Sequence, residues 1–442
     1  MNQAVLSSTE EILIVKDSIT SSKLKISEQD HGGCGAEEGL ISVDQALELM
    51  ISRTQPLATE IILLKDALNR YLAKPIYSEI ELPLFSQSAV DGYAIFTGLQ
   101  TEPVGTQFEL IGEIRAGQTA DIQLKQGQAV RIFTGAKIPE NTTTVARQEI
   151  VQVNKLLDST QIELTDALHI HADIRDVGEE VSLGQLLAEA GQCLNVGAIA
   201  ALSMAGVKAV EVFQYPKIAV VVTGDEVAEN VEDLASGKIF DANAPLIQSW
   251  FHSYNQDVDL MHVADTEQAV TELFERIKFE YDLILTTGGV SVGDYDFVRP
   301  VALSSGFEQI FWKVKQKPGK PTFFADYQKK DKSHCYLLGL PGNPGAVYAG
   351  MQIYVTTLLK ALQGQKSLPE WFSGIIQHGL KSDARERFLR MSATSQQGRL
   401  VLKSLPKQQS HMLSNLMQAN CLVRIPAGQD IVEGTELQVL LI

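Results

Sequence analysis

The sequence predicts a multidomain protein of α/β plus all-β class. Strand–helix alternation runs through residues 217–362, short strand-like runs between Gly, Pro and Asn fill residues 76–190, and this β texture returns after residue 371. Alternating strands and helices indicate a parallel sheet with helices on both faces, whereas short strands between turn residues are typical of sandwiches and barrels. We therefore expect a central parallel-sheet α/β domain, an inserted β domain and a C-terminal β-barrel.

Length and charge limit the classes of protein that remain. The 442 residues suggest about three or four domains at roughly 100–200 residues each. Hydrophobic residues make up 45% and charged residues 21%, as in globular proteins with large cores. With 37 basic and 54 acidic residues the net charge is −17, which repels phosphate backbones and anionic lipids. We expect no nucleic-acid partner and no membrane partner.

The cysteines and the apolar runs indicate a cellular compartment. The four cysteines lie far apart, without the spacing of a zinc site, a redox motif or a disulfide framework. The apolar run at residues 12–15 is too short for a signal peptide, and no run approaches the ~18–20 apolar residues of a membrane helix. We expect a cytoplasmic protein.

The pattern of apolar residues, turn residues and helix caps along the sequence also indicates domain boundaries. Ser42 begins a capping box, apolar residues follow at helical spacing as far as Pro56, and residues 60–73 suggest a second short helix. The expected parts are a flexible N-terminal extension (1–40), an elongated linking domain in two segments (41–80 and 160–215), an inserted β domain (81–159), an α/β domain (216–365) and a C-terminal β-barrel (366–442).

Three glycine-bearing loops, at residues 223–226, 286–296 and 339–344, follow three expected parallel strands. Ligands of open α/β sheets bind beyond the carboxyl ends of the strands, where glycines let backbone N–H groups approach an anion. Each loop could instead be an ordinary strand-to-helix turn, but three in one domain favour a binding site. The candidate binding residues are Thr223, Gly224, Asp225, Gly288, Gly289, Ser291, Gly293, Asp294, Pro341, Gly342 and Asn343.

Carboxylates stand beside these glycines, at Asp225, Glu226, Asp241, Asp294 and Asp296. A divalent hard cation would reconcile them with an anion, because Mg²⁺ usually binds one or two carboxylates together with substrate phosphates. The alternative interpretation is that they are helix N-caps, a position that favours Asp.

The segment Lys317-Pro-Gly-Lys320-Pro321 is a second candidate site. Its prolines restrict the backbone, so the lysines are presented by a stiff turn. Stiff positive charge suits a compact oxyanion, with charge-assisted hydrogen bonds worth about 1.5–3 kcal/mol each. The alternative is a solvated basic turn.

With these motifs in view, the sequence resembles the molybdopterin molybdenumtransferases, the MoeA-type enzymes of molybdenum-cofactor synthesis that include the E domain of gephyrin. The resemblance begins near residue 40 and covers the rest of the chain. It rests on the motifs above together with Ser88-Ala-Val-Asp91-Gly-Tyr-Ala94, the segment 131–139 and Ser410-His-Met-Leu. It implies a molybdopterin-binding α/β domain and an elongated homodimer, whose cleft joins the α/β domain of one subunit to the β domain of the other.

The resemblance also implies a reaction, the Mg²⁺-assisted insertion of molybdate into adenylated molybdopterin with release of AMP and molybdenum cofactor. It implies transient contact with molybdopterin adenylyltransferase and with molybdoenzymes. The catalytic residues would be Asp91, Glu226, Asp241 and Asp296, with Glu226 and Asp241 as Mg²⁺ ligands. Lys317, Lys320, Ser410 and an arginine such as Arg385 or Arg390 would hold molybdate, and Thr134 and Pro321 would also contact substrate. Asp91 could alternatively be only a turn residue before Gly92.

The chain departs from the family pattern at several positions. Arg147, Asp176 and Glu180 replace a Met, an Arg and an Asp, and Ala346 removes a hydroxyl that the family commonly carries. The departures suggest a divergent paralogue with an altered rate or specificity. Two other functions therefore stay open at this point: a non-catalytic molybdopterin-binding or scaffold protein, and adenylylation of molybdopterin by the α/β domain.

Overall fold

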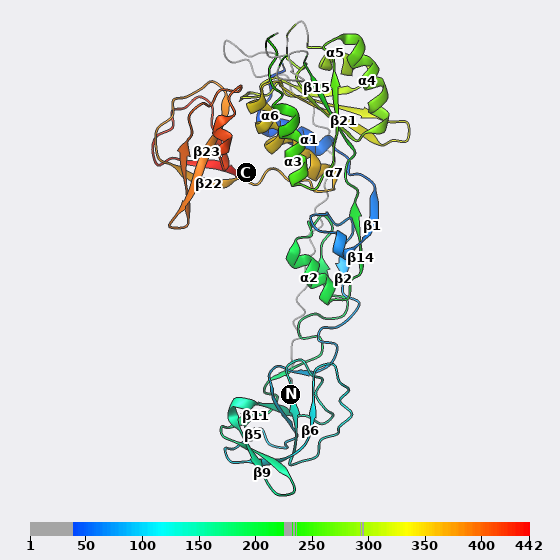
Figure 1. The fold of residues 1–442 in the computed structure, drawn as a ribbon, viewed down its shortest axis with the longest axis vertical. Helices are drawn as coiled ribbons and strands as arrows, with labels where there is room; N and C mark the ends of the chain where they lie inside the picture. Colours follow the sequence, from blue (N-terminus) through cyan, green and yellow to red (C-terminus); the bar gives the residue numbers. More distant parts are fainter. Residues whose placement is uncertain (1–38, 225–231, 233–234, 236, 292, 294–295) are drawn as a thin grey trace, which may run out of the picture. The chain divides into compact units, whose positions relative to one another are not determined.

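The computed structural model describes residues 39–224, 232, 235, 237–291, 293 and 296–442 (Figure 1). The predicted N-terminal extension, residues 1–40, lies outside this range except for its last two residues.

The α/β domain is built on a six-stranded sheet with the order β16-β15-β17-β21-β20-β18. Its strands are β15 (Ile218–Thr223), β16 (Asp259–Val263), β17 (Leu283–Thr287), β18 (Glu308–Trp312), β20 (Phe323–Gln328) and β21 (His334–Leu340). The predicted parallel sheet is confirmed for β16, β15, β17 and β21, whereas β20 runs antiparallel to both of its neighbours, β21 and β18. The short turn between β20 and β21 explains this edge, because a parallel pair needs a long crossover.

Helices cover both faces of this sheet (Figure 1). They are α3 (Asn243–Ser253), α4 (Glu267–Glu280), α5 (Val298–Ser304), α6 (Pro344–Gly350), a π-helical turn η4 (Met351–Val355) and α7 (Thr356–Leu362). Strand β15 alternates between the two cores: Ile218 and Val220 belong to the core that includes α3, α6 and α7, while Ala219 and Val221 belong to the core that includes α4 and α5.

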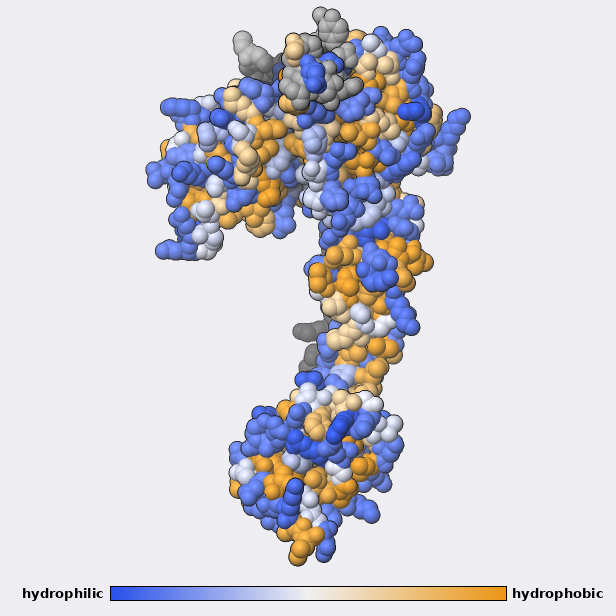
Figure 2. Space-filling view, in the orientation of Figure 1, coloured by the Kyte–Doolittle hydropathy of each residue, from blue (hydrophilic) through white to orange (hydrophobic). Residues whose placement is uncertain are grey.

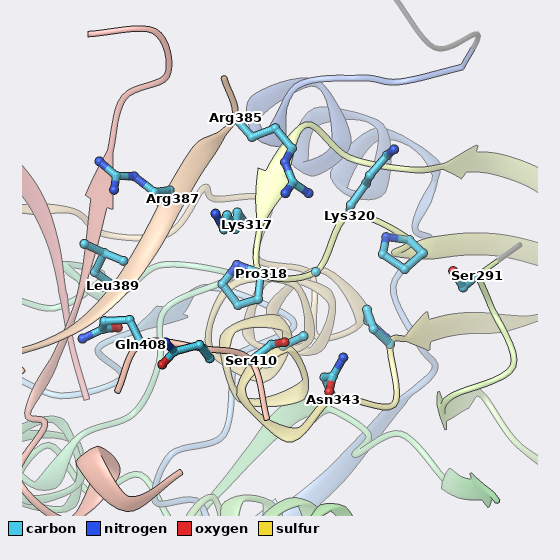
Figure 3. A pocket seen from close by; sticks show the side chains of 15 residues that line it. Ser291, Lys317, Pro318, Lys320, Asn343, Arg385, Arg387, Leu389, Gln408 and Ser410 are labelled. Atoms are coloured by element: carbon cyan, nitrogen blue, oxygen red, sulfur yellow. The ribbon is translucent and has the colours of Figure 1, made fainter. Parts of the chain in front are cut away.

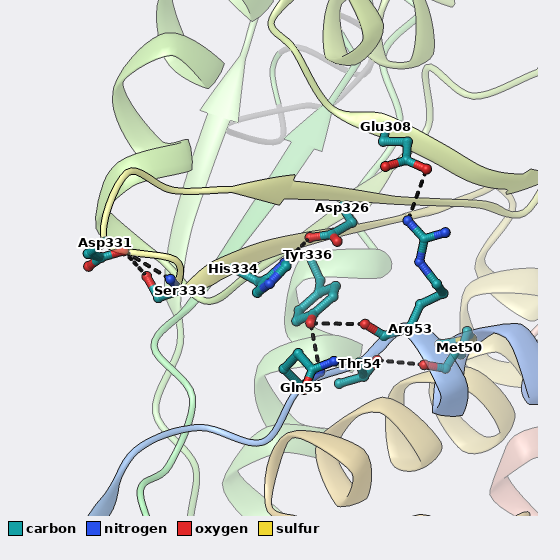
Figure 4. A network of polar contacts seen from close by, with 10 residues as sticks. All are labelled: Met50, Arg53, Thr54, Gln55, Glu308, Asp326, Asp331, Ser333, His334 and Tyr336. Atoms are coloured by element: carbon teal, nitrogen blue, oxygen red, sulfur yellow. Dashed lines mark hydrogen bonds and ion pairs between the residues drawn. The ribbon is translucent and has the colours of Figure 1, made fainter. Parts of the chain in front are cut away.

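Helix α1 (Val43–Arg53) starts with the predicted capping box at Ser42 but packs against the α/β core rather than in the linking domain. Its C-terminal end is fixed by polar contacts (Figure 4). Arg53 pairs with Glu308 at 2.9 Å, and the Tyr336 hydroxyl accepts from the Gln55 N–H at 2.8 Å. The first helix of the predicted linking segment 41–80 thus contributes to the core of the α/β domain.

The linking domain contains β1 (Thr59–Leu63), η1 (Leu64–Asp66), β2 (Ile76–Tyr77), β13 (Leu186–Ala188), α2 (Val196–Met204) and β14 (Ala209–Phe213). The predicted helix at 60–73 is wrong, because residues 59–63 pair antiparallel with β14 along their whole length. The alternation of exposed and half-buried side chains in β1 is the period of a strand and not of a helix.

The inserted β domain has a six-stranded sheet, β8-β4-β7-β6-β10-β9, and two separate two-stranded sheets, β11-β5 and β12-β3. Its elements are β3 (Gln87–Ser88), β4 (Gly92–Ile95), β5 (Thr101–Glu102), β6 (Gln107–Ile114), β7 (Gln128–Ile132), β8 (Thr144–Arg147), η2 (Gln148–Ile150), β9 (Val151–Lys155), β10 (Thr160–Leu164), β11 (Leu168–His169) and β12 (Ile174–Arg175). Strand β10 pairs with both β6 and β9, so the domain continues beyond the predicted boundary at residue 159.

The C-terminal domain is a closed β-barrel, in which β23 pairs with β24 on one side and β25 on the other. Its elements are β22 (Phe372–Ile376), β23 (Glu386–Gln396), β24 (Arg399–Ser404), η5 (Ser414–Met417), β25 (Cys421–Ile425) and β26 (Glu436–Leu441). Strand β19 (Gln316–Lys317) lies within the α/β domain in sequence, but it pairs in parallel with β23 of the barrel. The turn at residues 317–321, which we name the lysine turn, therefore starts on the barrel sheet.

Within the described residues, every helix is too short or too polar to cross a membrane.

Candidate active site

A cavity of 540 Å³ lies where the strand-end loops of the α/β domain meet the barrel (Figure 3). We name it the cationic cavity because four basic side chains line it. Its lining residues are Ser291, Lys317, Pro318, Gly319, Lys320, Pro321, Pro341, Asn343, Ala346, Arg385, Arg387, Leu389, Gln408, Gln409 and Ser410. Eight residues predicted as binding residues lie here: Ser291, Lys317, Lys320, Pro321, Pro341, Asn343, Arg385 and Ser410.

The lysine turn is held by a buried glutamine. The side chain of Gln316 is fully buried, and its Nε2 donates to the Gly319 carbonyl at 3.3 Å, which also accepts from the Thr322 hydroxyl at 2.8 Å. The hydroxyl of Tyr354, in the π-helical turn, donates to Gln316 Oε1. Gly319 has φ +96°, and a Cβ there would stand 2.5 Å from Gln316 Nε2, so the turn requires glycine. The lysines are therefore presented by a rigid turn.

Lys317 has a carboxylate partner in the barrel. Its Nζ lies 2.8 Å from Asp383 Oδ2, and this contact holds the pKa of Asp383 below its usual value. About half of the Lys317 side chain is exposed, so the pair contributes little to stability. The contact fixes the direction of the ammonium group more than it strengthens the fold.

Alternation along β23 decides which arginines reach the cavity. Successive side chains of a strand point to opposite faces. Arg385 (just before the strand), Arg387 and Leu389 line the cationic cavity, whereas Phe388 and Arg390 lie on the other face and are 2% and 3% exposed. Of the two arginines proposed from the sequence, Arg385 is at the cavity and Arg390 is not.

Arg390 instead supports the loop that carries Ser410. Its Nη1 donates to the Met412 carbonyl at 2.6 Å, and its Nη2 donates to the carbonyls of Lys407 and Gln409 at 3.1 Å each. The Gly345 N–H donates to the Ser410 carbonyl at 2.7 Å. A Cβ on Gly345 would stand 2.8 Å from that oxygen, so only glycine allows the loop to approach helix α6 this closely.

A second cavity of 270 Å³ adjoins the same strand ends, and we name it the carboxylate pocket. Its lining residues are Val222, Thr223, Ile239, Phe240, Asp241, Ala242, Asn243, Asp265, Gly288, Gly289, Asp296, Gly342 and Pro344. The loop after β21 contributes to both sites, because Pro341 and Asn343 line the cationic cavity while Gly342 and Pro344 line the carboxylate pocket.

The glycines after β17 are required by packing. Gly288 and Gly289 have φ +93° and +67°, and a Cβ on Gly288 would stand 2.8 Å from Thr223 Oγ1. The Gly288 N–H donates to the Leu340 carbonyl at 2.9 Å. These contacts bring the loops after β15, β17 and β21 together, as the sequence pattern predicts.

Asp241 and Asp296 both accept backbone hydrogen bonds in the loops. Asp241 Oδ1 accepts from the N–H groups of Asn243 and Ala244 at 2.8 and 3.1 Å, and Asp296 Oδ2 accepts from the Gly293 N–H at 2.7 Å. Asp241 is not the N-cap of α3, which is Ala242, but its hydrogen bonding to the first N–H groups of the helix resembles that of a capping side chain. This hydrogen bonding does not exclude a second role, because a carboxylate has about four acceptor positions and both residues line the pocket.

The residues of this pocket fit a Mg²⁺ ion bound together with phosphate. Asp241 and Asp296 supply two carboxylates, and the buried Asn243 Oδ1 has no hydrogen-bond partner among the residues that the structure describes. One or two carboxylates plus substrate phosphates are the usual Mg²⁺ donor set. Among the described residues no group of three or more His, Cys, Asp or Glu could hold a metal by itself, so such an ion would need ligands from the substrate.

Asp91 and Thr134 lie in the inserted β domain and line neither cavity. The Thr134 N–H and hydroxyl donate to Asp91 Oδ1 at 2.9 and 2.8 Å. These bonds lower the pKa of Asp91, so the carboxylate is ionised at neutral pH.

The remaining predicted residues divide into two groups. Gly224 and Gly293 are described but line neither cavity. Asp225, Glu226 and Asp294 lie outside the described residues, and with them one of the two proposed Mg²⁺ ligands.

Two of the departures from the family pattern form ion pairs in one loop of the β domain. Arg147 pairs with Asp173 at 2.7 Å and His171 with Asp176 at 2.9 Å. Glu180 follows this loop, and its N–H donates to the Leu82 carbonyl at 2.9 Å. Ala346 lines the cationic cavity and is 2% exposed. Only the last departure therefore changes the lining of a cavity.

Sequence reasoning missed several lining residues. Arg387 and Leu389 could have been found from the strand period starting at Arg385. Asn243 lies in the segment Phe240-Asp241-Ala242-Asn243, a variant of a family motif, but was not predicted to bind, and Asp265, Gln408 and Gln409 have no motif of their own.

Comparisons with known proteins agree with this architecture. The chain matches the MoeA N-terminal region (domain I and II) over residues 41–206, the probable molybdopterin-binding domain over 219–361 and the MoeA C-terminal region (domain IV) over 374–442.

Two curated relatives carry the name molybdopterin molybdenumtransferase. The protein from Haemophilus influenzae is 34% identical over 404 residues, which are 90% of this chain and 97% of that protein. The protein from Staphylococcus epidermidis is 30% identical over 394 residues, 88% of this chain and 92% of the relative. The crystal structure of the molybdopterin biosynthesis MoeA protein from Pyrococcus horikoshii OT3 is similar with a TM-score of 0.76 at 25% identity, and covers 91% of this chain and all of that one. From its three matched regions and these full-length relatives, the chain belongs to the MoeA family of molybdopterin molybdenumtransferases.

Proposed function

We propose that this protein is a molybdopterin molybdenumtransferase that inserts molybdate into the dithiolene of adenylated molybdopterin during molybdenum-cofactor synthesis. The observation that carries the proposal is the shared loop at residues 341–344, which lines both a cationic cavity and a carboxylate pocket. An oxyanion and a metal-bridged diphosphate can thus bind side by side.

The cationic cavity would bind molybdate. Molybdate is a tetrahedral dianion, and Lys317, Lys320 and Arg385 offer it positive charge from two rigid elements, the lysine turn and the start of β23. The Ser410 hydroxyl would add a donor, held in place through the Gly345–Ser410 backbone contact.

The carboxylate pocket would bind the diphosphate of the adenylated substrate. Backbone N–H groups of the glycine loops would contact the phosphate oxygens, and Asp241 and Asp296 would hold Mg²⁺. When bound, this ion would neutralise charge that develops at the phosphate as the link to AMP breaks. Asp91, ionised by its contacts with Thr134, would position or activate the attacking water.

Asp91 and Thr134 would complete the site from the second subunit of a homodimer. The linking domain supports this proposal, because Figure 2 shows apolar surface gathered over it. Ile61 (74% exposed), Leu63 (53%) and Val196 (74%) are exposed apolar residues of this domain. Exposed apolar surface of this kind marks a protein interface.

The homodimer can be tested by sedimentation. We expect wild type and Leu157→Glu, whose side chain is fully exposed on a β-domain turn, to sediment as dimers. Ile61→Glu should shift the protein to monomers, because it places a charge in the apolar face. A wild-type monomer at micromolar concentration would contradict a shared site.

We also propose a cytoplasmic location, supported by the free thiols Cys193, Cys335 and Cys421. The partners would be molybdopterin adenylyltransferase upstream and molybdoenzymes that accept the cofactor.

The reaction can be tested directly. Purified protein, adenylated molybdopterin, Mg²⁺ and molybdate are mixed and AMP release is followed. We expect molybdate-dependent release, with Lys320→Ala raising the molybdate KM about tenfold and Asp91→Asn lowering AMP release about tenfold, as the loss of one charge-assisted contact implies. Lys330→Ala, at an exposed turn, is the matched control. Tight binding of the substrate without turnover would instead indicate a scaffold protein.

A further inference from the structure

We propose that Arg387 is an anion-capturing residue that raises the affinity of the cationic cavity for molybdate. The proposal rests on the proposed function and adds a residue that no motif identifies. Arg387 is half-buried and lines the cationic cavity. It pairs in parallel register with Lys317, which joins β23 to β19.

The register places two basic residues opposite each other in neighbouring strands. Neighbouring strands lie about 4.8 Å apart, and paired residues of a sheet point to the same face. Like charges directly opposite each other destabilise a sheet. Asp383 contacts Lys317 at 2.8 Å, and Arg387 adds a further positive charge beside this pair. A dianion bound in the cavity would offset this positive charge.

Among the described residues Arg387 has no carboxylate partner. Its Nη2 donates to the Lys381 carbonyl, and its buried Nε has no hydrogen-bond partner. Arg424, which lies on the adjacent strand β25, is different, because its guanidinium contacts both Glu386 and Asp44. Arg424 is neutralised by the fold, whereas the charge of Arg387 is available to a ligand.

Figure 3 shows Lys320 and Arg387 on opposite sides of Lys317, with Arg387 next to Leu389. The positive charge of the cavity therefore extends along the barrel wall and does not converge on one point. Such an extended field raises the local concentration of an anion and its rate of association. Because this attraction acts on free molybdate and on molybdate in the transition state alike, its loss should raise KM and leave kcat unchanged.

The test uses molybdate alone and then turnover. Equilibrium dialysis of the full-length protein with molybdate should give a dissociation constant about fivefold higher for Arg387→Gln than for wild type, with a weaker dependence on salt. Arg387→Lys should restore most of the affinity, because the charge is kept. Arg399→Gln, on the exposed start of β24, is the matched control and should bind as wild type does.

The turnover assay separates this inference from the proposed function. We expect Arg387→Gln to raise the molybdate KM about fivefold at unchanged kcat, with an unchanged melting temperature. If wild type binds and inserts molybdate while Arg387→Gln matches it in affinity and KM, Arg387 has no capture role. A lowered melting temperature with unchanged affinity would likewise overturn it, leaving a structural arginine. If wild type itself neither binds nor inserts molybdate, the proposed function has failed.

Discussion

The carboxylate pocket and the cationic cavity adjoin each other but are built differently. The polar residues of the pocket lie mostly in the loops after parallel strands, beside the glycines that shape those loops. The cavity combines the lysine turn, alternate positions from Arg385 along β23 and a loop near Ser410. The residues of a loop motif lie together in space because they are close in sequence. The residues of the cationic cavity lie together because of strand register and contacts between domains.

The largest expected effect is the loss of AMP release when a carboxylate of the carboxylate pocket is replaced. Asp241→Asn should lower AMP release about 100-fold, because under the proposed function it removes a charge beside the reacting phosphate. The melting temperature should change little, since the side-chain oxygen of Asn can accept the same two backbone hydrogen bonds. Asp158→Asn, on an exposed turn of the β domain, is the control. Full activity in Asp241→Asn would leave this pocket without a part in the reaction.

The second effect separates the two faces of β23. Arg390→Gln should lower the free energy of unfolding by about 3 kcal/mol, because the buried guanidinium bonds three carbonyls of the 407–412 loop. Urea denaturation would measure this, with Arg387→Gln as the paired variant on the cavity face. If the two variants were equally stable, Arg390 would not support the 407–412 loop more than Arg387 does, and the two faces of β23 would not differ in this way.

The smallest effect concerns the Lys317–Asp383 pair. Because the pKa of Asp383 is lowered in the folded protein, its stabilising contribution is present above the unfolded pKa of about 3.9 and is lost as pH falls through the folded value. Wild type should melt slightly higher than Asp383→Asn at pH 7, and the difference should shrink in acid. A difference that grows in acid would contradict the lowered pKa.

The sequence was sufficient for features that local chemistry determines. The capping box at Ser42, the glycine loops and the lysine turn all use residues close in sequence, and the structure brings the loops of β15, β17 and β21 together as expected. The positions of Lys317 and Lys320 at the cavity follow from the same turn. Their roles toward a substrate stay predictions.

Other features depend on pairing that the sequence does not display. Residues 60–73 were expected to form a helix, but their partner strand lies 150 positions away at Ala209–Phe213. Arg390 was expected at the anion, but one step along a strand moves a side chain to the opposite face. The predicted boundary at residue 159 lies between β9 and β10, and the pairing of these two strands in one sheet is not visible in the sequence.

The contact at Gly345 has a consequence for how the chain can vary. Even a methyl group at this position would force the Ser410 carbonyl and the Arg390 guanidinium to retreat, since both lie within 3 Å of where it would stand. Helix α6 and the barrel loop at residues 407–412 would then lie farther apart. The absence of a side chain at Gly345 thus sets the width of the cationic cavity, and Gly345→Ala should widen this cavity although every charged residue that lines it is kept.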